Sequence, residues 1–145
     1  MTDLNVAADV IDGESFETVR YPDDEIRLRA VGSGAIEVIE YISTDREGPP
    51  AHSHPWDEVE YVIECEAEFL VNGRWTRGGP GTVQLLPAGS PHSVRVPEGT
   101  TRILMITIGS PFAPFARELS ALYASSDASL ERVVGVARRH GLRLT

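Results

Sequence analysis

The feature that most constrains the fold is a series of short segments that alternate polar and apolar residues and are separated by glycine- and proline-rich turns. The segments read, in chain order, EIRLRAV, AIEVIEYIS, EVEYVIE, EAEFLVNG, TVQLLP, SVRVPEG and TRILMITIG. A period of two places every second side chain on the same face of a strand. One turn contains Asn72-Gly73, a dipeptide typical of a two-residue hairpin. Many short strands of this kind predict a small β-barrel or a roll of two sheets.

The pattern changes after Pro111 from a period of two to helical spacing. The segment FAPFARELSALYA predicts a core-facing helix, because its apolar residues fall on one stripe. The members of that stripe are Phe112, Phe115, Leu119, Leu122 and Tyr123. Ser129 predicts the start of a second helix, LERVVGVARRH, and Gly141 predicts its end. We therefore expect an N-terminal arm or edge strand over residues 1–17, a β-barrel over 18–110 and C-terminal helices over 111–145.

Length and charge exclude several classes of protein. A chain of 145 residues suits one well-buried core and is too short for two ordinary domains. The formal net charge is −9, which argues against a nucleic-acid partner and against binding to anionic membranes. The sequence contains no apolar run long enough to cross a bilayer and no basic-then-apolar leader, so we expect a cytoplasmic protein. A single cysteine, Cys65, excludes an internal disulfide.

Three of the four histidines fall between residues 51 and 93, and two of them are one residue apart. On a regular strand His52 and His54 would face the same way, and Glu58 would share their parity if the strand continued across Pro55. If the strand that carries His92 pairs beside them, three imidazoles and a carboxylate would meet inside the barrel. Such a donor set suits a divalent first-row metal and leaves positions open for substrate, water or dioxygen.

The first histidine block resembles a conserved motif of the cupin superfamily, G-x5-H-x-H-x3-4-E-x6-G. His52, His54 and Glu58 match it, whereas Cys65 stands where the final glycine would be. The leading glycine is out of register, because Gly48 lies too close to His52.

The second block resembles the other cupin motif, G-x5-P-x-G-x2-H-x3-N. Gly81, Pro87, Gly89 and His92 match at every offset, and Val96 replaces the asparagine. The gap between the blocks is short, as in small bacterial single-domain cupins of the quercetinase-like type.

The resemblance implies an all-β fold, a double-stranded β-helix or jelly roll, with a metal ion inside and a short C-terminal helical segment. The ligand positions that it carries over are His52, His54, Glu58 and His92. The ion would be iron, manganese, nickel, copper or zinc, since this donor set accepts all of them. The resemblance also implies a homodimer, in which the acidic arm before Ser15 would lend a strand to the partner's sheet.

Two residues beside the ligands have open roles. Glu60 shares the inward parity, so it would be a general base or a carboxylate that orients a ligand; alternatively it is solvated or paired with Arg95 or Arg102. Trp56 would form either a wall of the pocket mouth or a cover for the loop.

Other side chains are assigned to packing. Phe69, Leu86, Val94, Leu104 and Met105 are expected to line the barrel and to favour a largely hydrophobic ligand. Tyr61 is expected in the core, Cys65 as a half-buried thiol, and His140 as a structural residue at a helix end.

Three functions from different classes fit these features. The first is a mononuclear metal-dependent dioxygenase acting on a small phenolic or enol-type substrate, with Glu58 and Glu60 in the catalytic centre. The second is a metal-dependent isomerase, cyclase or hydrolytic enzyme in which Glu60 shuttles a proton. The third is a non-catalytic cupin that binds a small molecule.

Overall fold

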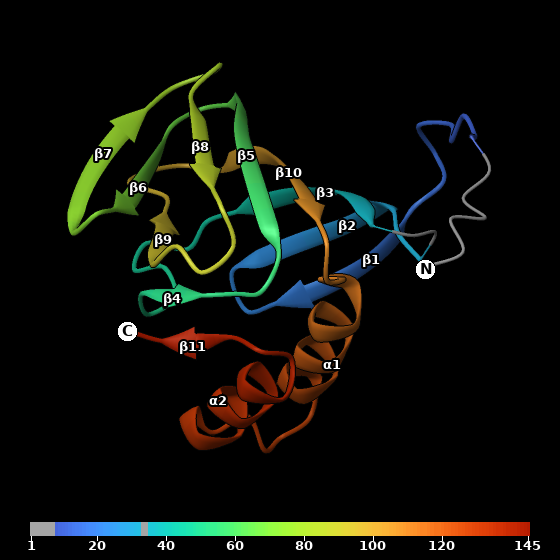
Figure 1. Ribbon diagram of the computed structural model, residues 1–145, viewed down its shortest axis with the longest axis vertical. Helices are drawn as coiled ribbons and strands as arrows, with labels where there is room; N and C mark the ends of the chain where they lie inside the picture. The colour runs from blue at the N-terminus through green and yellow to red at the C-terminus, as the bar shows by residue number, and fades with distance from the viewer. Residues whose placement is uncertain (1–7, 33–34) are drawn as a thin grey trace.

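A computed structural model describes residues 8–32 and 35–145, which form two facing antiparallel sheets and a C-terminal helical pair (Figure 1). The six-stranded sheet has the order β1 (Glu17–Tyr21), β2 (Asp24–Ala30), β3 (Ile36–Ser43), β10 (Thr101–Ile108), β5 (Asp57–Glu64) and β8 (Val83–Leu86). The five-stranded sheet has the order β11 (Arg143–Leu144), β4 (His52–Ser53), β9 (His92–Arg95), β6 (Ala67–Val71) and β7 (Arg74–Gly78). This arrangement confirms the predicted jelly roll.

The predicted strands are all present, and the structure adds four more. Strands β4 and β11 have only two residues each, and β7 (RWTRG) shows no alternation of buried and exposed positions, so no period of two marks them. Strand β1 begins at Glu17, the last residue of the predicted arm. Residues 1–7 of that arm lie outside the described residues, and residues 8–16 form no strand.

The Asn72-Gly73 hairpin joins β6 to β7 as predicted, with Val71 paired to Arg74. Both turn residues have positive φ, 54° for Asn72 and 74° for Gly73, as the first and second positions of a type I′ turn require. Cys65 also has a positive φ of 64°, which explains why the family motif places a glycine there. Its thiol is exposed, so the prediction of a half-buried cysteine was wrong.

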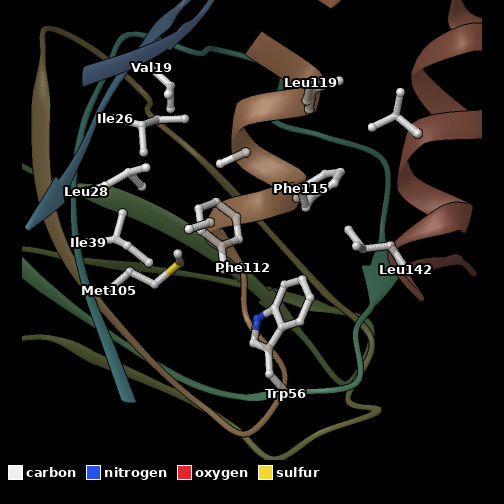
Figure 2. Close-up of a cluster of buried hydrophobic side chains, with 13 residues drawn as sticks. Val19, Ile26, Leu28, Ile39, Trp56, Met105, Phe112, Phe115, Leu119 and Leu142 are labelled. Carbon is white, nitrogen blue, oxygen red and sulfur yellow. The ribbon is translucent and has the colours of Figure 1, made fainter. Parts of the chain in front are cut away.

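The largest hydrophobic core lies between the six-stranded sheet and the helices α1 (Ala113–Ala124) and α2 (Leu130–Arg139) (Figure 2). Phe112, Phe115 and Leu119 of the predicted stripe are buried there, and Leu122 and Tyr123 pack against them half-buried. Figure 2 shows the Trp56 side chain reaching from its loop toward Phe112, and the two ring centroids are 5.9 Å apart. The helical tail therefore completes the core of the sheet.

The end of the chain returns to the strand that carries His52. The predicted start of α2 is confirmed, since Ser129 Oγ accepts a hydrogen bond from the Arg132 amide at 3.3 Å. Gly141, with a φ of 84°, follows the helix, and the chain then pairs with β4, where Leu144 lies opposite His52. The C-terminal segment thus covers the edge of the sheet beside the histidines.

Glu37 is a buried carboxylate that replaces the missing side-chain cap of α1. Its Oε1 accepts hydrogen bonds from Thr107 Oγ1 at 2.7 Å and from the Phe112 amide at 2.6 Å, and its Oε2 accepts one from the Ala113 amide at 3.1 Å. Phe112 itself offers no side-chain cap. Because the first amides of a helix lack partners within the helix, Glu37 fixes where α1 leaves the sheet.

Replacing Glu37 by leucine is expected to lower the free energy of unfolding by about 2–4 kcal/mol, because two buried amides and a hydroxyl lose their acceptor. Chemical denaturation followed by far-UV circular dichroism measures the change. Glu40→Leu is the matched control: Glu40 lies on the same strand, pairs with Arg27 and Arg102 near the surface, and should change stability by less than ~1 kcal/mol. Equal effects of the two variants would contradict the capping role.

Candidate metal centre

The predicted ligands come from both sheets and converge between them. His52 on β4 lies opposite His92 on β9, as expected. Glu58 belongs to β5 in the other sheet, and His54 lies in the bend between them. The strand does not stay regular across Pro55, because β4 ends at Ser53 and β5 begins at Asp57. The parity argument predicted the correct inward direction for Glu58. Its premise of one continuous strand was wrong, because the chain changes sheets at this bend.

Three of the four predicted ligands form a compact group. One ligand atom from each of His54, Glu58 and His92 lies within 4.8 Å of the others, and all three residues are buried. Glu58 Oε1 lies 3.3 Å from His54 Nε2, and Glu58 Oε2 lies 3.8 Å from His92 Nε2. His52 is beside this group, with its ring centroid 4.5 Å from that of His92. Its role as a fourth ligand stays a prediction.

Backbone carbonyls orient all three imidazoles in the same way. The Nδ1 atom of His52 lies 2.8 Å from the Pro50 carbonyl, and the corresponding distances are 3.0 Å from His54 to Trp56 and 2.8 Å from His92 to Ser90. A carbonyl only accepts hydrogen bonds, so each Nδ1 carries the proton. In the neutral rings each Nε2 therefore presents a lone pair.

Trp56 contacts two of the predicted ligands. Its indole Nε1 donates a hydrogen bond to Glu58 Oε1 at 3.2 Å, and its ring stacks on His54 with centroids 4.4 Å apart. The residue is 1% exposed and lines the cavity beside the histidines, so of the two predicted roles it is a buried part of the pocket wall and not a cover for the loop. Sequence reasoning missed its function because a hydrogen bond to a ligand leaves no periodic signal.

The group fits a divalent cation. His54 Nε2 is buried and has no hydrogen-bond partner, although a buried polar atom is normally paired. Burial lowers the pKa of His92 to about 4 and also lowers the pKa of His52, so both rings are neutral at pH 7. Burial alone would raise the pKa of Glu58, but His54 and then Glu60 act against it and lower that pKa to about 2. Neutral imidazoles and an ionised carboxylate are the forms that bind metals.

Glu60 is buried beside Glu58, with 7% of its surface exposed. The predicted alternatives of a solvated residue or an arginine partner were wrong, because Arg95 pairs with Glu68 and Arg102 with Glu40 and Glu64. Burial, and then the charge of Glu58, raise the pKa of Glu60 well above its ordinary value.

Gln84 lies directly opposite Glu60 across the β5–β8 pair. Its side chain is 3% exposed, and both its amide atoms lack partners, as does Glu60 Oε2. Sequence reasoning missed Gln84, although its inward parity with Leu86 in TVQLLP was a signal. Together the two side chains form a polar pair next to the metal ligands.

A cavity of about 450 Å³ extends from the histidines toward the helical tail. Val94 and Met105 line it as predicted, and Phe112 and Tyr123 contribute from the tail. Of the other predicted lining residues, Phe69 and Leu86 are buried without lining the cavity, and Leu104 points to the outer side of the sheet. Tyr61 is 45% exposed, so its predicted core position was wrong. The cavity suits a small, largely apolar molecule.

Asp24 also lines the cavity. Burial raises its pKa to about 6, and Asp45 and Asp23 add to this effect, while a hydrogen bond with Ser43 opposes it. The folded protein therefore binds a proton at Asp24 more tightly than the unfolded chain does, and stability falls as pH rises from about 4 through about 6.

Asp24→Asn is expected to remove that loss and to raise the free energy of unfolding at pH 7 by up to about 2–3 kcal/mol. At pH 3.5, where Asp24 is protonated in the folded protein and mostly protonated in the unfolded chain, the variant should differ little from the unmodified protein. Denaturation curves at both pH values test this, with Asp127→Asn as the control at an exposed carboxylate that is not among the groups acting on Asp24. A gain at pH 3.5 equal to that at pH 7 would contradict the role of the charge.

His140 is at the C-terminal end of α2, where it pairs with Glu118, in agreement with a structural role. Among the described residues, no helix is both long and apolar enough to cross a membrane.

Comparisons with known proteins agree with this fold. The family model described as a cupin domain matches residues 38–108. The dimethylsulfoniopropionate lyase DddQ of Ruegeria pomeroyi is 43% identical over 47 residues, which are 32% of this chain and 23% of the lyase. The chain therefore matches less than a quarter of that curated relative's length.

Solved structures show the same architecture. The polyketide cyclase RemF of Streptomyces resistomycificus superposes with a TM-score of 0.59 at 23% identity, over 70% of this chain and 80% of that chain. DddQ superposes with a TM-score of 0.54 at 25% identity, over 60% and 47% of the two chains. The Streptomyces nucleoside dehydratase Pac13 gives 0.58 at 10% identity, over 70% and 82%.

Proposed function

Since this chain belongs to the cupin superfamily through the domain at residues 38–108, we propose that it is a metal-dependent enzyme that transfers protons on a small, largely apolar substrate. The observation that carries the proposal is the position of Glu60. A second buried carboxyl lines the cavity next to Glu58 and keeps one oxygen without a partner. A structural carboxyl in this place would be expected to have its partners satisfied.

The proposed metal ligands are His52, His54, Glu58 and His92. A divalent ion held there would act as a Lewis acid on a substrate oxygen and make neighbouring C–H or O–H groups more acidic. The chain's own residues would have two separate roles. The three histidines and Glu58 fix the position of the substrate oxygen, while Glu60 accepts or returns a proton within the same cavity.

The position of Glu60 also favours one kind of substrate. Most of the cavity wall is apolar, and Glu60 supplies hydrogen-bonding atoms close to the predicted ligands. A substrate with an apolar body and a carbonyl, enol or hydroxyl group at one end would match both parts.

The relatives support a reaction without dioxygen. DddQ, RemF and Pac13 are named as a lyase, a cyclase and a dehydratase. Lyase and dehydratase reactions need an acid or base beside the reacting carbon, and Glu60 would provide it. This ranks proton transfer above the dioxygenase that the sequence alone favours.

Dioxygenation of a phenolic or enol-type compound is the second candidate. Three imidazoles and one carboxylate would leave open positions on an iron, manganese, nickel or copper ion. The apolar cavity also suits a phenolic ring. A non-catalytic binding role is the third candidate, and it does not explain why Glu60 is buried beside Glu58 with one oxygen unpartnered.

One experiment separates these candidates. The protein is loaded in turn with iron, manganese, nickel, copper or zinc and incubated in D2O with a panel of enol, β-substituted carboxylate and phenolic compounds. We expect metal-dependent incorporation of deuterium or elimination of a leaving group, seen by NMR, at unchanged oxygen concentration. Oxygen uptake with substrate would instead support the dioxygenase, and no turnover with any compound that shifts the melting temperature would support binding alone.

A further inference from the structure

Three aspartates gather where the cavity reaches the surface, near the turn between β1 and β2. Asp23 lies in that turn, Asp24 begins β2 and Asp45 follows β3, and all three line the cavity. The Thr44 amide donates a hydrogen bond to the Asp23 carbonyl at 2.9 Å, which joins the two segments. Asp24 lies opposite Ser43 across the β2–β3 pair. Asp23 is exposed and the other two aspartates are half-buried, and we call the three of them the acidic rim.

The acidic rim has no basic partner among the residues that the structure describes. Arg46, the residue after Asp45, donates to two backbone carbonyls instead. Arg95 also lines the cavity, but it pairs with Glu68 and stacks on Trp75. Carboxylates that are withdrawn from water are normally paired with a cation. The rim therefore presents negative charge to the cavity that the chain itself does not neutralise.

Three tyrosines line the cavity around Asp24. Tyr21 lies directly opposite Asp24 across the β1–β2 pair, and its ring centroid is 5.7 Å from that of Tyr123 on α1. Burial is the main cause that raises the pKa of Tyr21, Tyr41 and Tyr123, and the charge of Asp24 adds to it in each case. All three hydroxyls therefore lie within electrostatic reach of Asp24. Tyr21 Oη is buried without a hydrogen-bond partner among the described residues, although a buried hydroxyl is normally paired.

A cationic group with apolar substituents matches this part of the cavity. The faces of aromatic rings attract cations, and rings of this kind recognise alkylated ammonium groups in proteins. The carboxylates of the acidic rim add a charge of the opposite sign. An anionic group would be repelled by the same carboxylates, and an uncharged group would leave them without a counterion.

We propose that the acidic rim and the three tyrosines form a subsite for a substituted ammonium group, so that the cavity takes a small organic cation. The subsite belongs to the cavity that Glu60 and the predicted metal ligands also line. It names the charge of the substrate, and as a substrate site it rests on the proposed function. The binding of a cation at the rim is a separate property, and it can be measured without turnover.

The strand register gives the spacing between the two polar parts of the cavity. Asp24 lies in the row of Ser43 and Thr101, whereas Glu60 lies opposite Met105. Because Thr101 and Met105 are four residues apart on β10, the two rows are separated by about 13 Å along the strands. A substrate that occupies both parts would therefore carry its ammonium group several bonds away from the oxygen group that faces the metal ligands.

Calorimetric titration of the full chain with two small probes tests the subsite. The probes are choline and neohexyl alcohol, in which a tert-butyl group replaces the trimethylammonium group, so the two differ in charge and hardly in shape. Each is titrated to about 20 mM at low ionic strength. The pH is kept above the pKa of Asp24, which is about 6, so that its carboxyl is ionised. We expect choline to bind about 10-fold more tightly than the alcohol, or better.

Two variants should reduce this preference for different reasons. Asp24→Asn removes the charge and should lower the preference to about threefold or less. Tyr123→Leu removes one ring and should weaken choline by about 3–10-fold while it changes the alcohol less. Asp12→Asn is the matched control, because Asp12 is an exposed aspartate that does not line the cavity. It should keep the full preference, and circular dichroism checks the fold of each variant.

Equal binding of the two probes by the unmodified chain, or no binding of choline, would overturn the proposal. A preference that survives in folded Asp24→Asn would also overturn it, since the cation would then bind elsewhere. Loss of the preference in Asp12→Asn would show a general attraction to an acidic chain and would contradict the subsite equally. None of these results depends on catalysis, so the D2O screen still tests the proposed enzymatic function separately.

Discussion

The double variant His52→Ala/His54→Ala is expected to purify without bound metal, whereas the unmodified chain should hold close to one transition-metal ion. The two substitutions remove two imidazoles whose Nδ1 atoms are held by backbone carbonyls, and one of them, His54, has its Nε2 atom 3.3 Å from Glu58 Oε1. The remaining pair of ligands is too few for a stable site of this kind. Elemental analysis of protein kept free of chelators measures the metal directly.

The control for this variant is His140→Ala, which removes a histidine that pairs with Glu118 outside the site. It should keep the full metal content. Metal binding should also stabilise the fold, by about 4 kcal/mol when the free ion is at 1,000 times its dissociation constant. A chelator should therefore lower the melting temperature of the unmodified chain and leave the double variant unchanged. Absence of stoichiometric metal in the unmodified chain would contradict the proposed site.

The predictable part of the fold is the part with a strong local pattern. Residues close together in the sequence determine the long alternating strands β3 and β10, the Asn72-Gly73 hairpin and the helix cap at Ser129. Strands β4 and β11 pair over only two residues, so the contact that brings the C-terminus back to His52 depends on the tertiary fold. The helix cap formed by Glu37 also depends on the tertiary fold, because Glu37 accepts hydrogen bonds from amides that lie 75 and 76 positions further along the chain.

The candidate site was predictable in its ligands and less so in the residues around them. Motif spacing identified the histidines and Glu58, whereas the sequence assigned Tyr61 to the core and left Glu60 open. Parity along β5 placed Glu60 on the inward side with Glu58, as the structure has it, but it did not show that Glu60 is buried there. The error concerns the opposite side of β5, where Tyr61 is exposed and not in a core.

Tyr61 shows why the sequence did not indicate which side of β5 faces solvent. Periodicity shows that two sets of side chains lie on opposite faces, but an apolar residue on each face makes both faces resemble a core. β5 carries Val62 inward and Tyr61 and Ile63 outward. The apolar residues on both sides of β5 therefore left the solvent-facing side of this strand ambiguous in the sequence.

Glu60→Gln is expected to keep the fold and the metal while it lowers the rate of substrate deuteration or elimination by about 10²–10⁴-fold. Glutamine has nearly the same shape and keeps the buried position opposite Gln84 on the neighbouring strand. It cannot accept and return a proton, so only the chemical step should suffer. The measurements are turnover of the best substrate from the D2O screen and the metal content of the same sample.

The matched control is Glu64→Gln, which makes the same chemical change on the same strand at an exposed carboxylate. It should leave turnover unchanged, as a loss of net charge alone has no reason to affect the cavity. Glu58→Gln provides the contrast, because it should reduce metal content together with activity. If Glu60→Gln binds metal normally and turns over within threefold of the unmodified enzyme, Glu60 does not transfer the proton. The unpartnered oxygen would then serve only to bind substrate, and a decrease in affinity without a change in maximal rate would show it.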